Sequence, residues 1–191
     1  MCRNIKFWSI CAAAVVGTVV FALAIYAGFL QITGNFHTVI PGELYRSAQP
    51  TPAKIFEYHR RYDIKTIINL RGPNQGAQWY KDEVAASNQL RITHIDFNMS
   101  AGRELTVADA KSLITIFRKA QKPVLLHCRA GADRSGLASA LYLAVVAKSG
   151  EELAEEQISF RFGHVSLPGT AAYPMDSSWE DLEPWLGFQH S

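Results

Sequence analysis

Cys128 and Arg134 are residues of this 191-residue chain whose types and spacing suggest chemistry. Five residues separate them, and the segment around them reads His127-Cys128-Arg129-Ala130-Gly131-Ala132-Asp133-Arg134-Ser135. A cysteine thiolate is a strong nucleophile, and a guanidinium binds two oxygens of an anion through paired hydrogen bonds. The small residues between them let backbone N–H groups approach an anion closely. Residues 128–134, called the cysteine loop below, are therefore expected to bind an anion beside a nucleophilic sulfur.

The sequence on either side of the cysteine loop predicts a strand that enters it and a helix that leaves it. Residues 123–126 are apolar and short enough for a buried strand, and residues 135–147 form an apolar helix. The N-terminus of a helix favours negative charge and lowers the pKa of a nearby thiol by several units from about 8.5. Ser135 is placed to donate a hydrogen bond to the sulfur and help the thiolate leave, and His127 to hold the loop as a structural residue.

The pattern His-Cys-x5-Arg-Ser resembles the loop of protein tyrosine and dual-specificity phosphatases. The resemblance extends from about Leu44 to Ala147, because residues 44–47 and 64–71 are similar to the opening strands of compact, atypical dual-specificity phosphatases of bacterial type. It implies transfer of a phosphoryl group to Cys128, stabilisation of that group by Arg134, and hydrolysis of the phosphocysteine by water. It also implies that the reaction requires no metal ion and no cofactor.

Such a reaction needs a proton donor for the leaving group, and two aspartates are candidates. Asp96 lies at the end of a predicted strand, 32 positions before Cys128, which resembles the position of the general acid in small dual-specificity phosphatases. The segment 98–104 follows it and could close over a substrate. Asp133 lies inside the cysteine loop, an arrangement that resembles myotubularin-like lipid phosphatases. We expect Asp96 to be the acid and keep Asp133 as the alternative.

Alternating apolar strands and helices predict one α/β domain over residues 43–191, with a mixed, mainly parallel sheet flanked by helices. The tail from residue 163 is expected to be irregular, with an acidic stretch, 176–183, in a solvated turn. The expected strands are 44–47, 64–70, 92–97 and 123–126, and the expected helices are 51–62, 76–90, 106–120, 135–147 and 151–162.

The N-terminal part of the chain predicts a membrane anchor. No charged residue occurs between Phe7 and Gly42, and residues 7–32 are apolar and long enough to span a bilayer, which takes about 20 residues. Arg3 and Lys6 place residues 1–6 in the cytoplasm by the positive-inside rule, so the domain after the polar linker 33–42 is expected to be exported. The chain is then a single-pass inner-membrane protein with a periplasmic domain, if bacterial. A cleaved signal peptide is the competing interpretation.

The charge balance and the number of cysteines limit which binding and disulfide partners are expected. Apart from Arg3 and Lys6, 17 basic and 17 acidic residues balance, which argues against nucleic-acid binding. Cys128 is the only cysteine of the predicted exported domain, so no disulfide partner is available to it there.

The expected substrate is a phosphorylated protein, as phosphotyrosine or with dual specificity. A phospholipid or phosphoinositide is the alternative, because an anchor brings the domain close to lipid. Arg71 and Arg103 are further candidates for substrate contact, although a surface or packing role is the simpler interpretation of each. Two other functions compete: a rhodanese-like sulfurtransferase and a non-enzymatic phosphate-binding module.

Overall fold

The computed structural model describes residues 2–188, and the side chains of residues 13–188. The chain divides into two compact units, with the boundary between Thr33 and Gly34. The first unit is helix α1 (Cys2–Thr33), whose segment Ala13–Thr33 has a mean hydropathy of 2.3 and is long and apolar enough to cross a membrane. A signal sequence has the same properties, so the anchor stays a prediction. Arg3 and Lys6 precede the segment whose side chains are described.

The second unit is built on a five-stranded sheet in the order β1-β2-β5-β3-β4. Its strands β2, β5, β3 and β4 are parallel, and β1 pairs with β2 in the antiparallel sense. The mixed, mainly parallel sheet of the sequence prediction is thereby confirmed. The strands are β1 (His37–Ile40), β2 (Leu44–Ser47), β3 (Thr66–Asn69), β4 (Thr93–Asp96) and β5 (Val124–His127).

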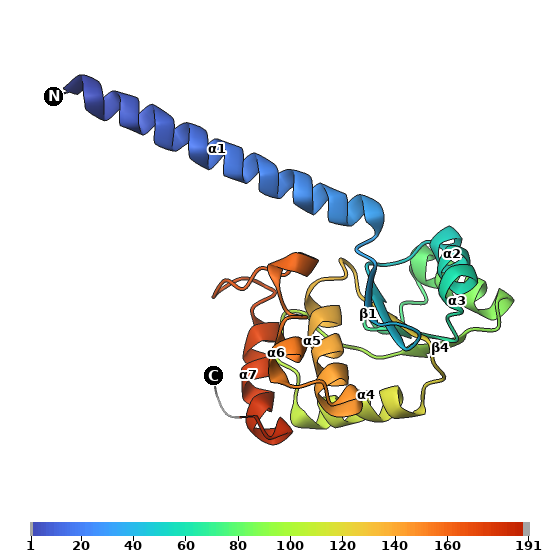
Figure 1. The fold of residues 1–191 in the computed structure, drawn as a ribbon. Helices are drawn as coiled ribbons and strands as arrows, with labels where there is room; N and C mark the ends of the chain where they lie inside the picture. The colour runs from blue at the N-terminus through green and yellow to red at the C-terminus, as the bar shows by residue number, and fades with distance from the viewer. Residues whose placement is uncertain (1, 189–191) are drawn as a thin grey trace. The chain divides into compact units, whose positions relative to one another are not determined.

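Helices α2 (Pro52–Tyr62) and α3 (Gln78–Gln89) cover one face of the sheet, on the right of Figure 1. Thr51 caps α2 by accepting a hydrogen bond from the Lys54 N–H, and Pro52 occupies the first helical position, where its missing N–H costs nothing. Ile55 of α2 packs with Ile67 and Leu125 of the sheet in the core on this side.

The other face is covered by α4 (Val107–Lys119), α5 (Asp133–Leu141), α6 (Glu151–Glu155) and α7 (Pro174–Leu186) (Figure 1). A π-helix, Tyr142–Ala147, continues α5. Leu126 of the sheet, Phe117 of α4 and Trp179 of α7 belong to the core on this side. Since side chains alternate between the two faces along a strand, successive residues of β5 enter different cores.

Three expectations about the elements were wrong. The expected linker 33–42 contains β1, whose side chains are mostly half-buried because the strand adds to the edge of β2. The expected helix 151–162 is interrupted, leaving α6 and a 3-10 helix, Phe160–Phe162. The tail is not irregular, because α7 forms there and buries Met175, Trp179 and Leu182, so the acidic stretch 176–183 is helical.

Candidate active site

The cysteine loop directly follows β5, and its last two residues, Asp133 and Arg134, form the start of α5. Cys128 directly follows β5 and is buried, with 1% of its surface exposed. Its Sγ accepts a hydrogen bond from the Gly131 N–H at 3.2 Å and lies 3.4 Å from the Ser135 hydroxyl oxygen. The structure thus brings Cys128 and Ser135 together as the sequence predicted, at the N-terminus of α5.

The carbonyl groups of the cysteine loop are held from outside the loop. Asn35 Nδ2 donates to the Ala130 carbonyl at 2.9 Å, and the Gln49 N–H donates to the Arg129 carbonyl at 3.3 Å. Arg46 Nη2 donates to the next two carbonyls, those of Gly131 and Ala132, at 3.0 and 2.8 Å. Across a trans peptide the C=O and the following N–H point in opposite directions, so the N–H groups of residues 130–133 point inward. This arrangement is a nest for an anion beside the sulfur.

Arg46 is a functional residue that the sequence analysis did not single out. Its side chain is fully buried, its Nη1 donates to the Gln157 carbonyl at 2.8 Å, and its guanidinium lies 4.2 Å from the Phe162 ring centre. Burial lowers the pKa of Arg46 to about 9, although the nearby Cys128 and Asp133 act in the opposite direction. Arg46 therefore remains a cation at neutral pH. An arginine inside an otherwise buried strand was the available signal.

A second buried cluster supports the loop from the α3 side. Glu83 of α3 is fully buried and accepts hydrogen bonds from His127 Nε2 at 2.9 Å, from His94 Nε2 at 2.7 Å and from the side chain of Gln49. Burial alone would raise the pKa of Glu83, but the attraction of His127 and these hydrogen bonds outweigh it and lower the pKa to about 2. The structural role expected for His127 has its partner in Glu83, which the sequence analysis missed.

Three arginines, Arg71, Arg129 and Arg134, lie close to one another near the nucleophile. Arg134 Nη1 donates to the Met99 carbonyl at 3.2 Å, and its Nε is buried without a hydrogen-bond partner. Arg71 lies over the Trp79 ring at 3.6 Å from its centre and donates to Gln49 Oε1 at 2.8 Å. Burial lowers the pKa of Arg71, and the nearby Arg134 and Arg129 lower it further. In the described part of the chain none of the three forms an ion pair.

Asp96 lies at the carboxyl ends of the parallel strands, where the cysteine loop follows β5. It is the last residue of β4 and is in register with Asn69, which is in register with His127. Its carboxylate accepts hydrogen bonds from Asn69 Nδ2 at 2.8 Å and from the Tyr80 hydroxyl at 2.5 Å. Tyr80 belongs to α3, so this carboxylate is directed to the α3 face, whereas Cys128 belongs to the core of the other face.

Asp133 is the first residue of α5, and 26% of its side chain is exposed. Its Oδ1 lies 2.8 Å from Nδ1 of His164, a buried residue outside every sequence motif considered above. The sequence gives no signal for this contact, because the two residues are 31 positions apart.

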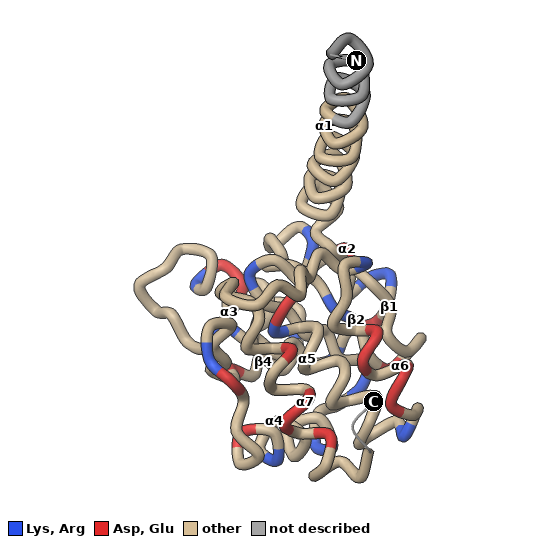
Figure 2. Tube along the Cα trace, turned by 90° about the vertical axis from the view of Figure 1, so that its left-hand side faces the viewer, with Lys and Arg blue, Asp and Glu red and all other residues tan. Residues whose placement is uncertain are grey.

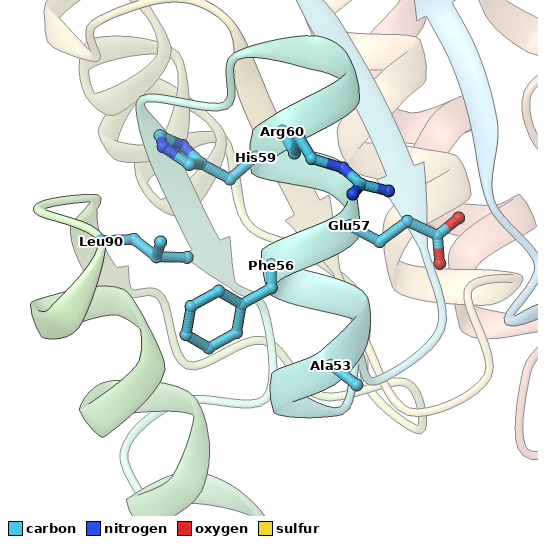
Figure 3. Close-up of a pocket in the computed structure, with 6 residues that line it drawn as sticks. All are labelled: Ala53, Phe56, Glu57, His59, Arg60 and Leu90. Carbon is cyan, nitrogen blue, oxygen red and sulfur yellow. The ribbon is translucent and has the colours of Figure 1, made fainter.

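A further hollow, of about 490 Å³, lies between α2 and Leu90 at the end of α3 (Figure 3). Phe56, His59 and Leu90 converge on it, and Glu57 and Arg60 lie along one side of α2. None of these residues contacts the cysteine loop through a hydrogen bond among those described, and the hollow is not part of the site.

Comparison with known proteins agrees with this geometry. The family model of the tyrosine phosphatase family matches residues 28–157. The structure of P. aeruginosa TpbA is similar with a TM-score of 0.63 and 24% identity, over 78% of this chain and 85% of that one. The catalytic core of the PP-IP phosphatase SIW14 from S. cerevisiae has a TM-score of 0.58 and 21% identity, over 74% and 83%. PTPMT1 has a TM-score of 0.58 and 16% identity, over 80% and 98%.

The fold, the loop and these matches define a phosphatase of the cysteine-dependent class. The chain belongs to the tyrosine phosphatase family, as its match over residues 28–157 shows. The resemblance noted in the sequence is thereby confirmed. A variant of TpbA has also been solved in complex with phosphotyrosine.

Proposed function

We propose that this protein hydrolyses phosphomonoesters of proteins, as phosphotyrosine or with dual specificity, through a phosphocysteine on Cys128. The observation that carries the proposal is the nest: inward N–H groups of residues 130–133, beside a sulfur that already accepts one hydrogen bond. A dianionic phosphoryl group fits this site because the N–H groups, the start of α5 and Arg134 all favour negative charge.

The first step forms the sulfur–phosphorus bond. The Cys128 thiolate attacks phosphorus, the phosphorus–oxygen bond to the leaving group breaks, and the leaving oxygen takes a proton from Asp96. In the second step water attacks phosphorus, giving a proton to Asp96, and the thiolate leaves. Ser135, 3.4 Å from Sγ, stabilises the departing thiolate by donating a hydrogen bond. Arg134 exchanges the Met99 carbonyl for two phosphoryl oxygens.

Asp96 is favoured over Asp133 as the proton donor by the partners of each carboxylate. Asp96 accepts from a neutral amide and a neutral phenol, and to reach the leaving oxygen its carboxylate would turn from Tyr80 toward the cysteine loop. Asp133 is bonded instead to His164, a fully buried ring whose other nitrogen bonds Asp176, so its carboxylate is less free to turn toward a leaving oxygen.

The test is turnover of p-nitrophenyl phosphate and of a phosphotyrosine peptide by the full chain in detergent, beside its Cys128→Ser and Arg134→Lys variants. Cys128→Ser is expected to abolish turnover while retaining phosphate binding, because only the nucleophile is lost. Arg134→Lys is expected to lower kcat/KM by at least about 100-fold, since a point charge cannot bind two oxygens at once. Undiminished turnover by Cys128→Ser would exclude the covalent mechanism, and activity on thiosulfate alone would indicate a sulfurtransferase.

A phospholipid or phosphoinositide is the second candidate substrate, and the group of arginines near the cysteine loop favours it. Arg71 and Arg129 lie near Arg134 and could bind a second anionic group of one substrate. On this proposal Arg71→Gln lowers kcat/KM for a phosphoinositide about 10-fold more than for p-nitrophenyl phosphate, which has only one phosphate. Equal losses on both substrates would leave phosphotyrosine protein as the better candidate.

The segment Ala13–Thr33 supports a further part of the proposal: that α1 anchors the chain in the inner membrane with residues 1–6 in the cytoplasm and the phosphatase domain exported. Arg3 and Lys6 precede the apolar segment, and no basic residue follows it until Arg46. The membrane and its lipids are then the partners of α1, and the substrate is one that reaches the domain outside the cytoplasm.

A further inference from the structure

His164 connects the cysteine loop to the last helix of the fold. Its ring is fully buried, and both ring nitrogens contact carboxylates: Nδ1 lies 2.8 Å from Asp133 Oδ1, and Nε2 lies 2.9 Å from Asp176 Oδ2. Asp133 is in the first turn of α5 and Asp176 is in the first turn of α7. One imidazole therefore joins the N-terminal turns of two helices, one of which carries Arg134.

The two contacts determine the protonation state of the ring. An ionised carboxylate only accepts hydrogen bonds, and a neutral imidazole has only one N–H to donate. Both contacts are satisfied together when the ring is an imidazolium that donates from each nitrogen. Burial alone would lower the pKa of His164, but the hydrogen bonds to Asp133 and Asp176, and the charges of both, outweigh it and raise the pKa above 6.5.

The charged groups around this cluster are consistent with one buried cation between two anions. From α5 the ring faces Asp133, and from α7 it faces Asp176. On the strand side, Arg46 is close enough to Asp133 to be stabilised by it. On the outer side, Asp176 lines a hollow of about 120 Å³ together with Glu155 and Glu180, so it has access to solvent. Among these groups only Asp133 and Asp176 bond the ring.

Loss of the proton from His164 would leave a lone pair facing a carboxylate oxygen 2.8 to 2.9 Å away. That contact is repulsive, so one of the two carboxylates has to move. Asp133 is half-buried and immediately precedes Arg134, whose Nη1 donates to the Met99 carbonyl, so a shift of Asp133 changes the direction of the arginine. A misplacement of about 1 Å in a catalytic group costs on the order of 100-fold in rate.

We propose that His164 is a positioning residue of the phosphatase reaction: as an imidazolium, it ties Asp133 of the cysteine loop to Asp176 of α7 and so fixes the start of α5 and Arg134 for the phosphoryl group. This inference rests on the proposed function. It makes α7 part of the catalytic apparatus, although no residue of α7 contacts the cysteine loop through a hydrogen bond in the described structure.

The test uses the full chain in detergent micelles and compares two pH values: the midpoint at which His164 loses its proton and the midpoint at which kcat falls on the alkaline side. NMR of the histidine rings, assigned with His164→Gln, gives the pH at which His164 loses its proton; kcat for p-nitrophenyl phosphate gives the alkaline limb of the pH profile. In the wild type both midpoints are expected to coincide above pH 6.5. Asp176→Asn removes one of the two anions, so both midpoints should shift together to lower pH, by about one unit. His164→Gln should lower kcat about 10-fold or more and abolish that limb.

Asp181→Asn is the matched control, because Asp181 is an exposed carboxylate on the same helix and its loss changes the charge of α7 equally. His59→Gln controls for the loss of a histidine elsewhere. The inference is overturned if His164 titrates at or below pH 6.5, if the kinetic limb does not follow the NMR midpoint in Asp176→Asn, or if Asp181→Asn produces the same shift. If the wild type has no turnover, the proposed function fails; phosphate affinity measured by calorimetry then replaces kcat in the same comparison.

Discussion

Asp96 and Asp133 differ in what holds their carboxylates, and this difference can be tested with leaving groups. A general acid matters most when the leaving oxygen is strongly basic, because a poor leaving group departs only with a proton. Asp96→Asn is therefore expected to lower kcat about 100-fold or more for phenyl phosphate and about 10-fold or less for p-nitrophenyl phosphate. Asp133→Asn should lower both equally, because it disturbs the His164 cluster rather than the proton supply.

The measurement is kcat for the two substrates at one pH, for the wild type and both variants. A loss by Asp133→Asn that grows with the basicity of the leaving group would make the loop aspartate the acid, and a uniform loss by Asp96→Asn would remove Asp96 from that role. Tyr80→Phe provides a matched comparison, since it frees the Asp96 carboxylate while keeping its charge.

At the level of single residues, the sequence predicted those that adjoin the nucleophile in the chain. Cys128, Ser135 and the small loop residues could be recognised because spacing along a strand, loop and helix determines where they meet. Arg46, Glu83 and His164 could not, because each reaches the site from a distant element and makes contacts that only the packing of the sheet and helices creates. Their partners lie 11 to 111 positions away in the sequence.

At the level of elements, close packing between β2 and the cysteine loop predicts a large effect at Gly131. Gly131 has φ of +74°, and a Cβ there would lie 2.5 Å from the Ala48 nitrogen. Gly150 has φ of +88°, with nothing within 4 Å of a Cβ. Gly150→Ala should therefore cost about 1–2 kcal/mol of unfolding free energy for its backbone conformation alone. Gly131→Ala should cost about 1–3 kcal/mol more, since backbone atoms must shift.

Urea unfolding of the two variants measures these losses of unfolding free energy, and kcat/KM measures whether the cysteine loop remains active. We expect Gly131→Ala to lose most of its activity and Gly150→Ala to retain it. Equal stability losses in the two variants would show that the close approach to Ala48 is relieved without strain.

The elements that the sequence predicted are those with strong local signals. Thr51-Pro52 and Thr106 mark the starts of α2 and α4, and both threonines accept the expected backbone hydrogen bonds. β1 was missed because four residues at a sheet edge carry little periodic pattern. α7 was missed because no side chain caps its start and Pro184 lies inside it; Pro174 at its first turn and Gly187 after its end were the available signals.

At the level of the whole molecule, the chain combines an uncharged helix segment with a domain on which both signs of charge are mixed (Figure 2). We expect the full chain to remain in the membrane after alkaline carbonate extraction, with its N-terminus intact by mass spectrometry. A C-terminal alkaline phosphatase fusion should be active and a C-terminal green fluorescent protein fusion dark, because the domain is exported unfolded.

A soluble product whose N-terminus lies directly after a small residue of the apolar segment, such as Ala24 or Ala27, would instead identify the segment as a cleaved signal sequence. A fluorescent fusion in the membrane fraction would show that the orientation is the reverse of the one proposed. Replacing Arg3 and Lys6 by neutral residues is the informative variant, since it removes the charge asymmetry and should mix the two orientations.

The outward hydrogen bonds of the cysteine loop have a consequence for product release. Because Asn35, Gln49 and Arg46 hold the loop carbonyls through contacts within the protein itself, most of the conformational entropy lost in ordering the anion nest is lost during folding and not on binding. A rigid nest gains affinity equally for every tetrahedral oxyanion, including inorganic phosphate. The enzyme should therefore be sensitive to its own product and to vanadate, so the phosphate concentration of its compartment would set how much of it is free to act.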